Sequence, residues 1–230
     1  MRKISRRHKK NLELTKNNNY SSLVEAIEAL KETSTAKFVE SVELHANLNI
    51  DPKYADQQLR TTVTLPHGVG KQVKIAVLTN DENIEEAKSA GADLVGNEEL
   101  IEKITQGDLN FDLLIATPNM MPKLAKLGRV LGPKGLMPSP KSGTVSSSLQ
   151  TTLEDFKKGK FEYKADKTGI VHVTIGKTNF TTNQLVENLQ ALYNSIEKNR
   201  PSGVKGKYFK SLFLCTTMGP SIKLDLTSFS

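Results

Sequence analysis

The 230-residue chain contains no tryptophan and a single cysteine, and only 6% of its residues are aromatic. So few aromatic side chains argue against a protein that binds single-stranded nucleic acid by stacking bases on an aromatic platform. One cysteine, Cys215, excludes an internal disulfide and any metal site built from several cysteines, and it makes a reducing compartment the default. No apolar run approaches the roughly 20 residues that span a bilayer, so no membrane association is expected.

Residue patterns typical of catalytic or metal sites are also scarce. The histidines are scattered and lack the paired spacing of metal ligands; they are His8, His45, His67 and His172. Cys215 follows Phe213 and Leu214 in an apolar segment, a position that predicts a buried and inert thiol. We therefore expect no enzymatic activity, no catalytic residue, no metal and no cofactor.

The amino-terminal segment is rich in arginine and lysine, but no apolar stretch follows it, which excludes a secretory signal. Residues 4–16 have a helical pattern that includes acidic Glu13, which fits poorly with a removable transit peptide. This segment is therefore expected to be a basic helix.

Charge is unevenly distributed along the chain. The net charge is +7 and the isoelectric point about 9.3. When the chain is divided near Gly68 and Gly159, the middle segment holds 11 basic and 12 acidic residues, whereas the two flanks together hold 21 basic and 13 acidic residues. Because excess positive charge attracts phosphate, a nucleic-acid partner would be held by the flanks.

The flanks show the alternating pattern of strands that bury one face, together with amphipathic helices. Capping boxes at Ser22 and Thr181 each open a helix, the first ending near Thr33. The predicted strands cover 42–50, 61–65, 161–165, 170–175, 211–216 and 222–226. Residues 161–165 and 170–175 are expected to pair as a hairpin around the turn 166–169.

The middle segment has a different pattern, in which short and continuous apolar runs alternate with helices. The runs cover 73–78, 92–95 and 111–116; the helices cover 81–89, a segment capped by Asn97, and a last helix from Thr151 to near Gly159. Strands without alternation are typical of a parallel sheet that is covered on both faces.

These patterns predict an α/β protein with two domains. Residues 1–67 and 160–230 would form a discontinuous α+β sandwich, which carries the excess positive charge and would hold a nucleic-acid partner. Residues 68–159 would form an inserted, small, doubly wound (Rossmann-like) α/β domain. The two connections contain glycine and suit a hinge.

Two glycine-containing motifs have a structural and a functional interpretation. Gly68 and Gly70 precede Lys71 as in part of a phosphate-binding loop, but the spacing is wrong and Gln72 stands where a hydroxyl is needed, which favours a turn. Residues 128–141 combine glycines, prolines and bases, and predict either a structural Ω-type loop or a loop that contacts RNA or protein.

Three further places are possible RNA contacts. Phe38, beside Lys37 at a helix-to-strand junction, would either stack on RNA or belong to the core. Lys164 and Lys167 would form a basic hairpin tip, which could equally be only solvated. Residues 216–220 predict a tight turn in which backbones approach closely.

Several of these motifs occur together, and in order, in one family. The segment 127–145 closely resembles the signature of the large-subunit ribosomal protein one family. Further similar segments are 35–38, 65–71, 90–93, 166–169 and 217–220, so the resemblance spans nearly the whole chain. The chain therefore resembles this family along nearly its whole length.

The resemblance implies a two-domain protein whose first domain contains both termini. It also implies a structural constituent of the large ribosomal subunit, a monomer within the ribosome, that binds ribosomal RNA at the mobile stalk. Nearby exit-site tRNA would be a second partner, whose release the protein assists, and bacterial members also repress their own messenger RNA. The expected location is a ribosome in the bacterial cytoplasm or the plastid stroma.

The resemblance also assigns RNA-binding residues. They are Lys37, Phe38, Ser41, Ser211, Thr217, Met218 and Gly219, with Lys164, Lys167, Gly169 and His172 matching less closely. Ser41 keeps a hydroxyl where the family often has threonine. Asn47 stands where many members have lysine, and Ala165 replaces a polar residue, which weakens contacts there. The alternatives are a nucleotide-dependent enzyme that uses the middle domain and a non-ribosomal RNA chaperone or regulator.

Overall fold

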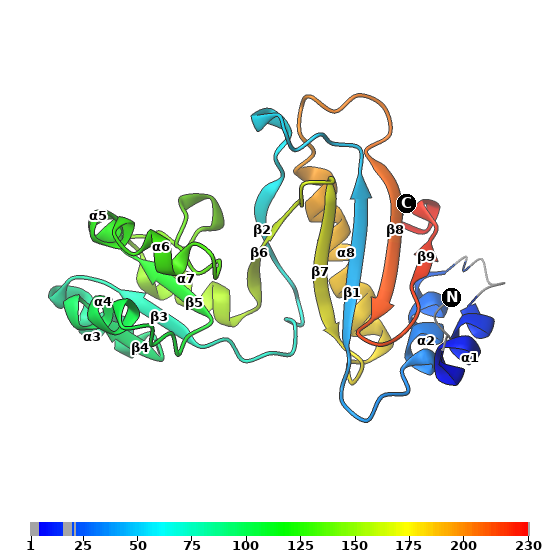
Figure 1. Ribbon diagram of the computed structural model, residues 1–230, viewed down its shortest axis with the longest axis horizontal. Coiled ribbons are helices and arrows are strands. Elements are labelled where there is room, and N and C mark those ends of the chain that lie inside the picture. The colour runs from blue at the N-terminus through cyan, green and yellow to red at the C-terminus, as the bar shows by residue number, and fades with distance from the viewer. Residues whose placement is uncertain (1–4, 16–19, 21, 230) are drawn as a thin grey trace. The chain divides into compact units, whose positions relative to one another are not determined.

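The computed structural model describes residues 5–15, 20 and 22–229. Its contacts divide the chain into two compact units. The first unit combines the chain up to Gly70 with the chain from Glu162 onward, and the second unit is Lys71–Phe161. The fold is mixed α/β, with antiparallel sheets from the two ends of the chain and a parallel sheet in the middle (Figure 1).

The first unit is built on a four-stranded antiparallel sheet with the strand order β7-β1-β8-β9 (Figure 1). Its strands are β1 (Ser41–Leu48), β7 (Ile170–Lys177), β8 (Phe209–Thr216) and β9 (Ile222–Leu224). Every second residue of β1 from Val42 to Leu48 is buried, and those between are half-buried. The predicted alternation of this strand is therefore confirmed, and only one face of the sheet lies on the core.

Two helices cover the buried face of this sheet. They are α2 (Leu23–Thr33) and α8 (Thr182–Lys198); each contacts the sheet and the other helix, and α1 (Arg6–Thr15) packs on α2. Both expected N-caps are present. The Ser22 hydroxyl accepts a hydrogen bond from Val24 N–H, and Thr181 with Gln184 forms a complete capping box. The ends of the predicted basic helix, residues 4 and 16, lie outside the described residues.

The predicted hairpin of 161–165 with 170–175 is wrong. β6 (Lys160–Lys164) pairs with β2 (Arg60–Thr64), whereas β7 pairs with β1. Between these two segments there is only the turn, where Asp166 N–H donates to Ile170 O, and one isolated antiparallel bridge, Ala165–Val171. The eight-residue β1 offers β7 a longer ladder than the five-residue β6, so more of the backbone groups of β7 are satisfied.

The second unit contains a three-stranded parallel sheet in the order β4-β3-β5. Its strands are β3 (Ile75–Leu78), β4 (Leu94–Gly96) and β5 (Leu113–Ala116); its helices are α3 (Ile84–Ser89), α4 (Glu98–Thr105), α5 (Met121–Ala125), α6 (Gly128–Leu131) and α7 (Leu149–Lys157). All four residues of β3 are buried. Two apolar clusters explain this burial. The first joins β3 to α4, α5 and α6, and the second joins it to α3 and α7, so helices cover both faces.

Several predicted boundaries in this unit are corrected. The helix predicted from Asp81 begins as a 3-10 turn, and α7 begins at Leu149 rather than Thr151. Asn97 occupies the N-cap position of α4, but its side chain makes no cap bond and donates to Asp81 Oδ1 at 3.2 Å. The predicted loop 128–141 contains the short helix α6, because buried Leu131 anchors it to the core.

In the part of the chain that the structure describes, no helix has both the length and the apolar content needed to cross a bilayer.

We predict that Asn188→Leu destabilises the first unit. Asn188 is fully buried; its side chain donates to Gly68 O at 2.9 Å and Ile175 O at 2.8 Å, and it accepts from His67 N–H at 3.1 Å. Leucine would leave these backbone groups unpaired, which should lower the free energy of unfolding by about 1–3 kcal/mol. Urea denaturation would measure this change.

The matched control is Asn194→Leu, which makes the same change at an exposed position of α8. It should alter the free energy of unfolding by less than about 0.5 kcal/mol. Equal stabilities of the two variants would contradict the structural role given to Asn188.

Candidate nucleic-acid interface

Exposed apolar side chains gather at the start of β1. Phe38 is 54% exposed, Val39 is 51% exposed, and Met218 is 49% exposed. Of the two interpretations of Phe38, the core position is therefore wrong. An exposed phenyl ring beside the exposed Lys37 can stack on a base or pack against a sugar.

A buried carboxylate fixes this region in place. Glu40 is 1% exposed and accepts hydrogen bonds from Ser34 Oγ at 2.9 Å, Ala36 N–H at 3.3 Å and Met218 N–H at 2.9 Å. Burial alone would raise the pKa of Glu40, but the hydrogen bonds to its carboxylate, with that from Met218 N–H the largest, together outweigh burial and hold that pKa below its ordinary value. Sequence reasoning missed Glu40, because nothing near it in the sequence indicates that residue 218 is its partner.

The turn after β8 is tied to the start of β1. Ser41 N–H donates to Thr217 Oγ1 at 3.0 Å, and Thr217 N–H donates to Ser41 O at 3.1 Å. Gly219 packs so closely that an added Cβ would collide with the Thr216 hydroxyl. This confirms the tight turn that the sequence predicts, and it places Thr217 and Met218 beside Ser41.

The expected RNA-binding residues form two groups rather than one. The first group, at the start of β1, is Lys37, Phe38, Ser41, Thr217, Met218 and Gly219. At the other end of β1, Asn47 pairs with Ile170 and with Ser211. Asn47 is six positions along the strand from Ser41, which is roughly 20 Å at about 3.4 Å per residue. The structure therefore places the expected contacts at both ends of one sheet.

The second group is Ser211 with Lys164, Lys167 and Gly169, which lie in or beside the turn between β6 and β7, and His172 lies between the two groups. Gly169 is buried with φ +81°, and an added Cβ would meet Ile50 O at 3.0 Å, so the backbone requires glycine here. Bonds from Ile170 N–H and from Thr168 to the Asp166 carboxylate hold the pKa of Asp166 below its ordinary value. Gly169 therefore shapes the turn and does not lie at a free tip.

Three lysines near these groups are available to an anionic partner. Lys37, Lys164 and Lys167 are exposed, and within the described residues none of them forms an ion pair. Lysines that are not neutralised by carboxylates keep their attraction for phosphate.

Between the two groups, the outward face of the sheet carries two histidines. His45 Nδ1 lies 2.7 Å from His172 Nδ1, and His45 Nε2 lies 3.0 Å from Cys215 Sγ. Burial and the neighbouring His172 lower the pKa of His45, and burial raises the pKa of the Cys215 thiol. Cys215 is half-exposed, so the prediction of a buried thiol is wrong; Leu214 and Thr216 take the buried positions on either side of it.

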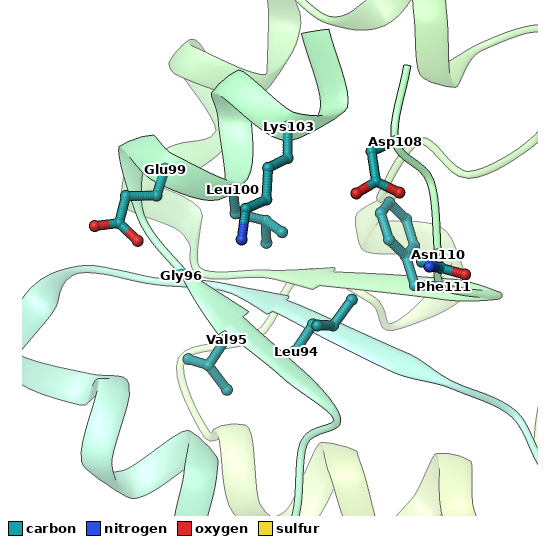
Figure 2. Close-up of a pocket in the computed structure, with 9 residues that line it drawn as sticks. All are labelled: Leu94, Val95, Gly96, Glu99, Leu100, Lys103, Asp108, Asn110 and Phe111. Carbon is teal, nitrogen blue, oxygen red and sulfur yellow. The ribbon is translucent and has the colours of Figure 1, made fainter. Parts of the chain in front are cut away.

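Neither feature that suggested nucleotide binding forms a suitable site. Gly68 N–H donates to Leu65 O at 3.2 Å, which makes the glycine motif a turn, and an added Cβ at Gly70 would lie 2.9 Å from the Phe180 ring. A pocket of about 150 Å³ in the second unit lies beside Leu94, Leu100 and Phe111 (Figure 2). Pockets for small ligands are usually about 300–1,000 Å³, so this pocket is small for a nucleotide. A second pocket of about 330 Å³ reaches that range, but Asp81, Glu98 and Glu99 line it, and their carboxylates would repel phosphate.

Comparisons with known proteins agree with the sequence motifs. A model of the Ribosomal protein L1p/L10e family matches residues 30–220. The chain is 79% identical to Large ribosomal subunit protein uL1c of Phaeodactylum tricornutum over the full length of both chains. It is 75% identical to uL1c of Trieres chinensis, again covering both chains fully. It is 56% identical to Large ribosomal subunit protein uL1 of Prochlorococcus marinus strain MIT 9515, over 99% of this chain and 97% of that protein. The chain therefore belongs to the ribosomal protein L1p/L10e family.

Proposed function

We propose that the protein, which is a structural constituent of the large ribosomal subunit, binds ribosomal RNA through its first unit. The observation that carries this proposal is the arrangement at the start of β1, where exposed Phe38 and Met218 lie beside hydroxyls and an unpaired lysine. The chain belongs to a family of ribosomal proteins and not to a family of enzymes.

The contacts suit a folded RNA surface. Phe38 offers a ring for stacking, and the hydroxyls of Ser41 and Ser211 can hydrogen-bond riboses, which distinguishes RNA from DNA. Lys164 and Lys167, with Lys37, add an attraction for phosphate that weakens with salt. The two groups of contacts are roughly 20 Å apart along β1, so the partner must offer contacts over at least that distance, as a folded RNA surface does.

The two units would have different roles. The first would be a discontinuous RNA-binding domain, and the second an inserted, doubly wound domain joined to it by glycine-containing connections that act as a hinge. The near-neutral charge of the second unit supports a role other than gripping RNA. Its motion would accompany release of exit-site tRNA, and the same RNA-binding surface would allow repression of the protein's own messenger RNA.

We place the protein in a plastid ribosome. Its identity to the uL1c proteins is 79% and 75%, against 56% for the cyanobacterial protein. The higher identity to the uL1c proteins supports the plastid stroma over the bacterial cytoplasm as the proposed location.

The first prediction tests the turn after β8. Thr217→Val removes the hydroxyl that accepts from Ser41 N–H, and should weaken binding to a ribosomal RNA fragment by about 1–3 kcal/mol. Thr217→Ser keeps the hydroxyl and is the matched control. Filter binding would measure both variants, with thermal unfolding as a check of folding. Equal RNA affinities of the two folded variants would remove Thr217 from the site.

The second prediction concerns Phe38. Phe38→Ala removes an exposed ring, and should lower RNA affinity by about 1–3 kcal/mol if a base stacks on it. Val24→Ala, at an exposed position of α2, should leave the affinity unchanged. An unaffected Phe38→Ala variant would show that this ring does not meet RNA.

The third prediction separates the units. A chain that joins residues 1–70 to residues 160–230 through a short glycine linker should bind the RNA fragment, whereas residues 71–161 alone should not, because the excess positive charge lies in the flanks. Binding by the middle unit alone would overturn the assignment.

A further inference from the structure

Three potential metal ligands meet on the outward face of the four-stranded sheet. Glu43, His45 and Cys215 each offer one donor atom, and these atoms lie within 4.8 Å of one another. In the part of the chain that the structure describes, this is the one group of three histidine, cysteine or acidic side chains that meets this condition. We propose that these three residues form a binding site for a divalent transition-metal ion of the zinc class.

The sheet register creates the group. β8 runs beside β1 (Figure 1), and Cys215 pairs directly with Glu43. His45 lies two residues further along β1, so its side chain points to the same face as that of Glu43. The backbone pairing that holds the sheet together therefore also holds the three donors in place.

The donors have the chemistry and spacing that Zn²⁺ requires. Thiolate, imidazole and carboxylate are its usual protein ligands. Ligand atoms around a tetrahedral Zn²⁺ lie roughly 3.3–3.6 Å apart, for Zn–S of about 2.3 Å and Zn–N of about 2.0 Å. His45 Nε2 is 3.0 Å from Cys215 Sγ and 3.8 Å from Glu43 Oε2, so small side-chain rotations suffice.

A neighbouring histidine supports the tautomer that binds metal. When His45 Nε2 is free to bind an ion, its ring proton lies on Nδ1 and is donated to His172 Nδ1, 2.7 Å away. His172 then carries its own proton on Nε2, which faces Asp166 Oδ2 at 3.7 Å. Metal-binding histidines usually have such a partner on the second ring nitrogen. His172 is therefore a positioning residue of this site.

The ion would be held by an open, three-residue site. Cys215 loses its thiol proton to solvent as the metal–sulfur bond forms, and His45 binds as the neutral imidazole. Because the cluster lies on a partly exposed face, with side-chain exposures of 26% for His45 and 37% for Glu43, water completes the tetrahedron.

The first test is calorimetric titration of Zn²⁺ into the full chain without a histidine tag. We expect one ion per chain for the parent protein and loss of measurable binding for Cys215→Ser. The matched control is His67→Gln, because His67 Nε2 lies 2.6 Å from Glu187 in a histidine–carboxylate pair without cysteine. This variant should bind Zn²⁺ like the parent protein. Zn²⁺ binding that persists in Cys215→Ser, or that is lost in His67→Gln, would overturn the site.

The second test uses Co²⁺ as a spectroscopic probe. Since the chain has one cysteine, a thiolate-to-cobalt charge-transfer band can come only from Cys215. We expect this band in the parent protein at one ion per chain, with a monomer in sedimentation. Absence of the band, or two chains per ion, would overturn the proposal. If Cys215→Ser fails to fold, Glu43→Gln should still weaken Co²⁺ binding; unchanged binding would count against the site.

The third test examines the positioning role of His172 in Zn²⁺ binding. His172→Leu removes the acceptor for His45 Nδ1–H and should weaken Zn²⁺ binding about 10–100-fold, the usual effect of losing such a partner. His172→Asn keeps an acceptor oxygen and should restore part of the affinity. Equal affinities of the two variants and the parent protein would overturn the positioning role.

Discussion

The pairing of β1 with strands from the distant end of the chain is the constraint on which the first unit depends. β1 lies between β7 and β8, so backbone groups on both of its edges are bonded to residues about 130–170 positions later. Neither end of the chain can complete this sheet alone. The same pairing turns the apolar residues of β1 to the buried face of the sheet, whose neighbouring strands contact α2 and α8, and it presents the alternate residues on the outward face.

Two buried polar side chains hold the segments next to the strands of this sheet in place. Glu40 connects the segment before β1 to the turn after β8 through a buried carboxylate, and Asn188 connects the chain near Gly68 to β7. Both side chains are fully satisfied or nearly so, which is what burial of polar atoms requires. As a result, Phe38 and Met218 are held exposed at a defined place instead of collapsing onto the core.

The outward face of the sheet combines two kinds of chemistry. Its ends carry hydroxyls, exposed apolar side chains and lysines, which suit RNA, whereas its centre carries donors that suit a transition metal. His172 lies at the boundary between them, since it is both an expected RNA contact and the partner of His45. A bound divalent ion would add positive charge to the face that we propose for RNA, where it would favour phosphate.

Local sequence was sufficient to predict most of the strands and the longer helices, but it missed the short helices α5 and α6. The alternation in β1, the continuous apolar run of β3 and the caps at Ser22 and Thr181 depend on neighbouring residues, and the structure confirms all of them. Pairing between distant segments could not be predicted in this way. The preference of β6 for β2, the Glu40 contacts and the meeting of Cys215 with His45 follow from strand register, which packing of the whole unit sets.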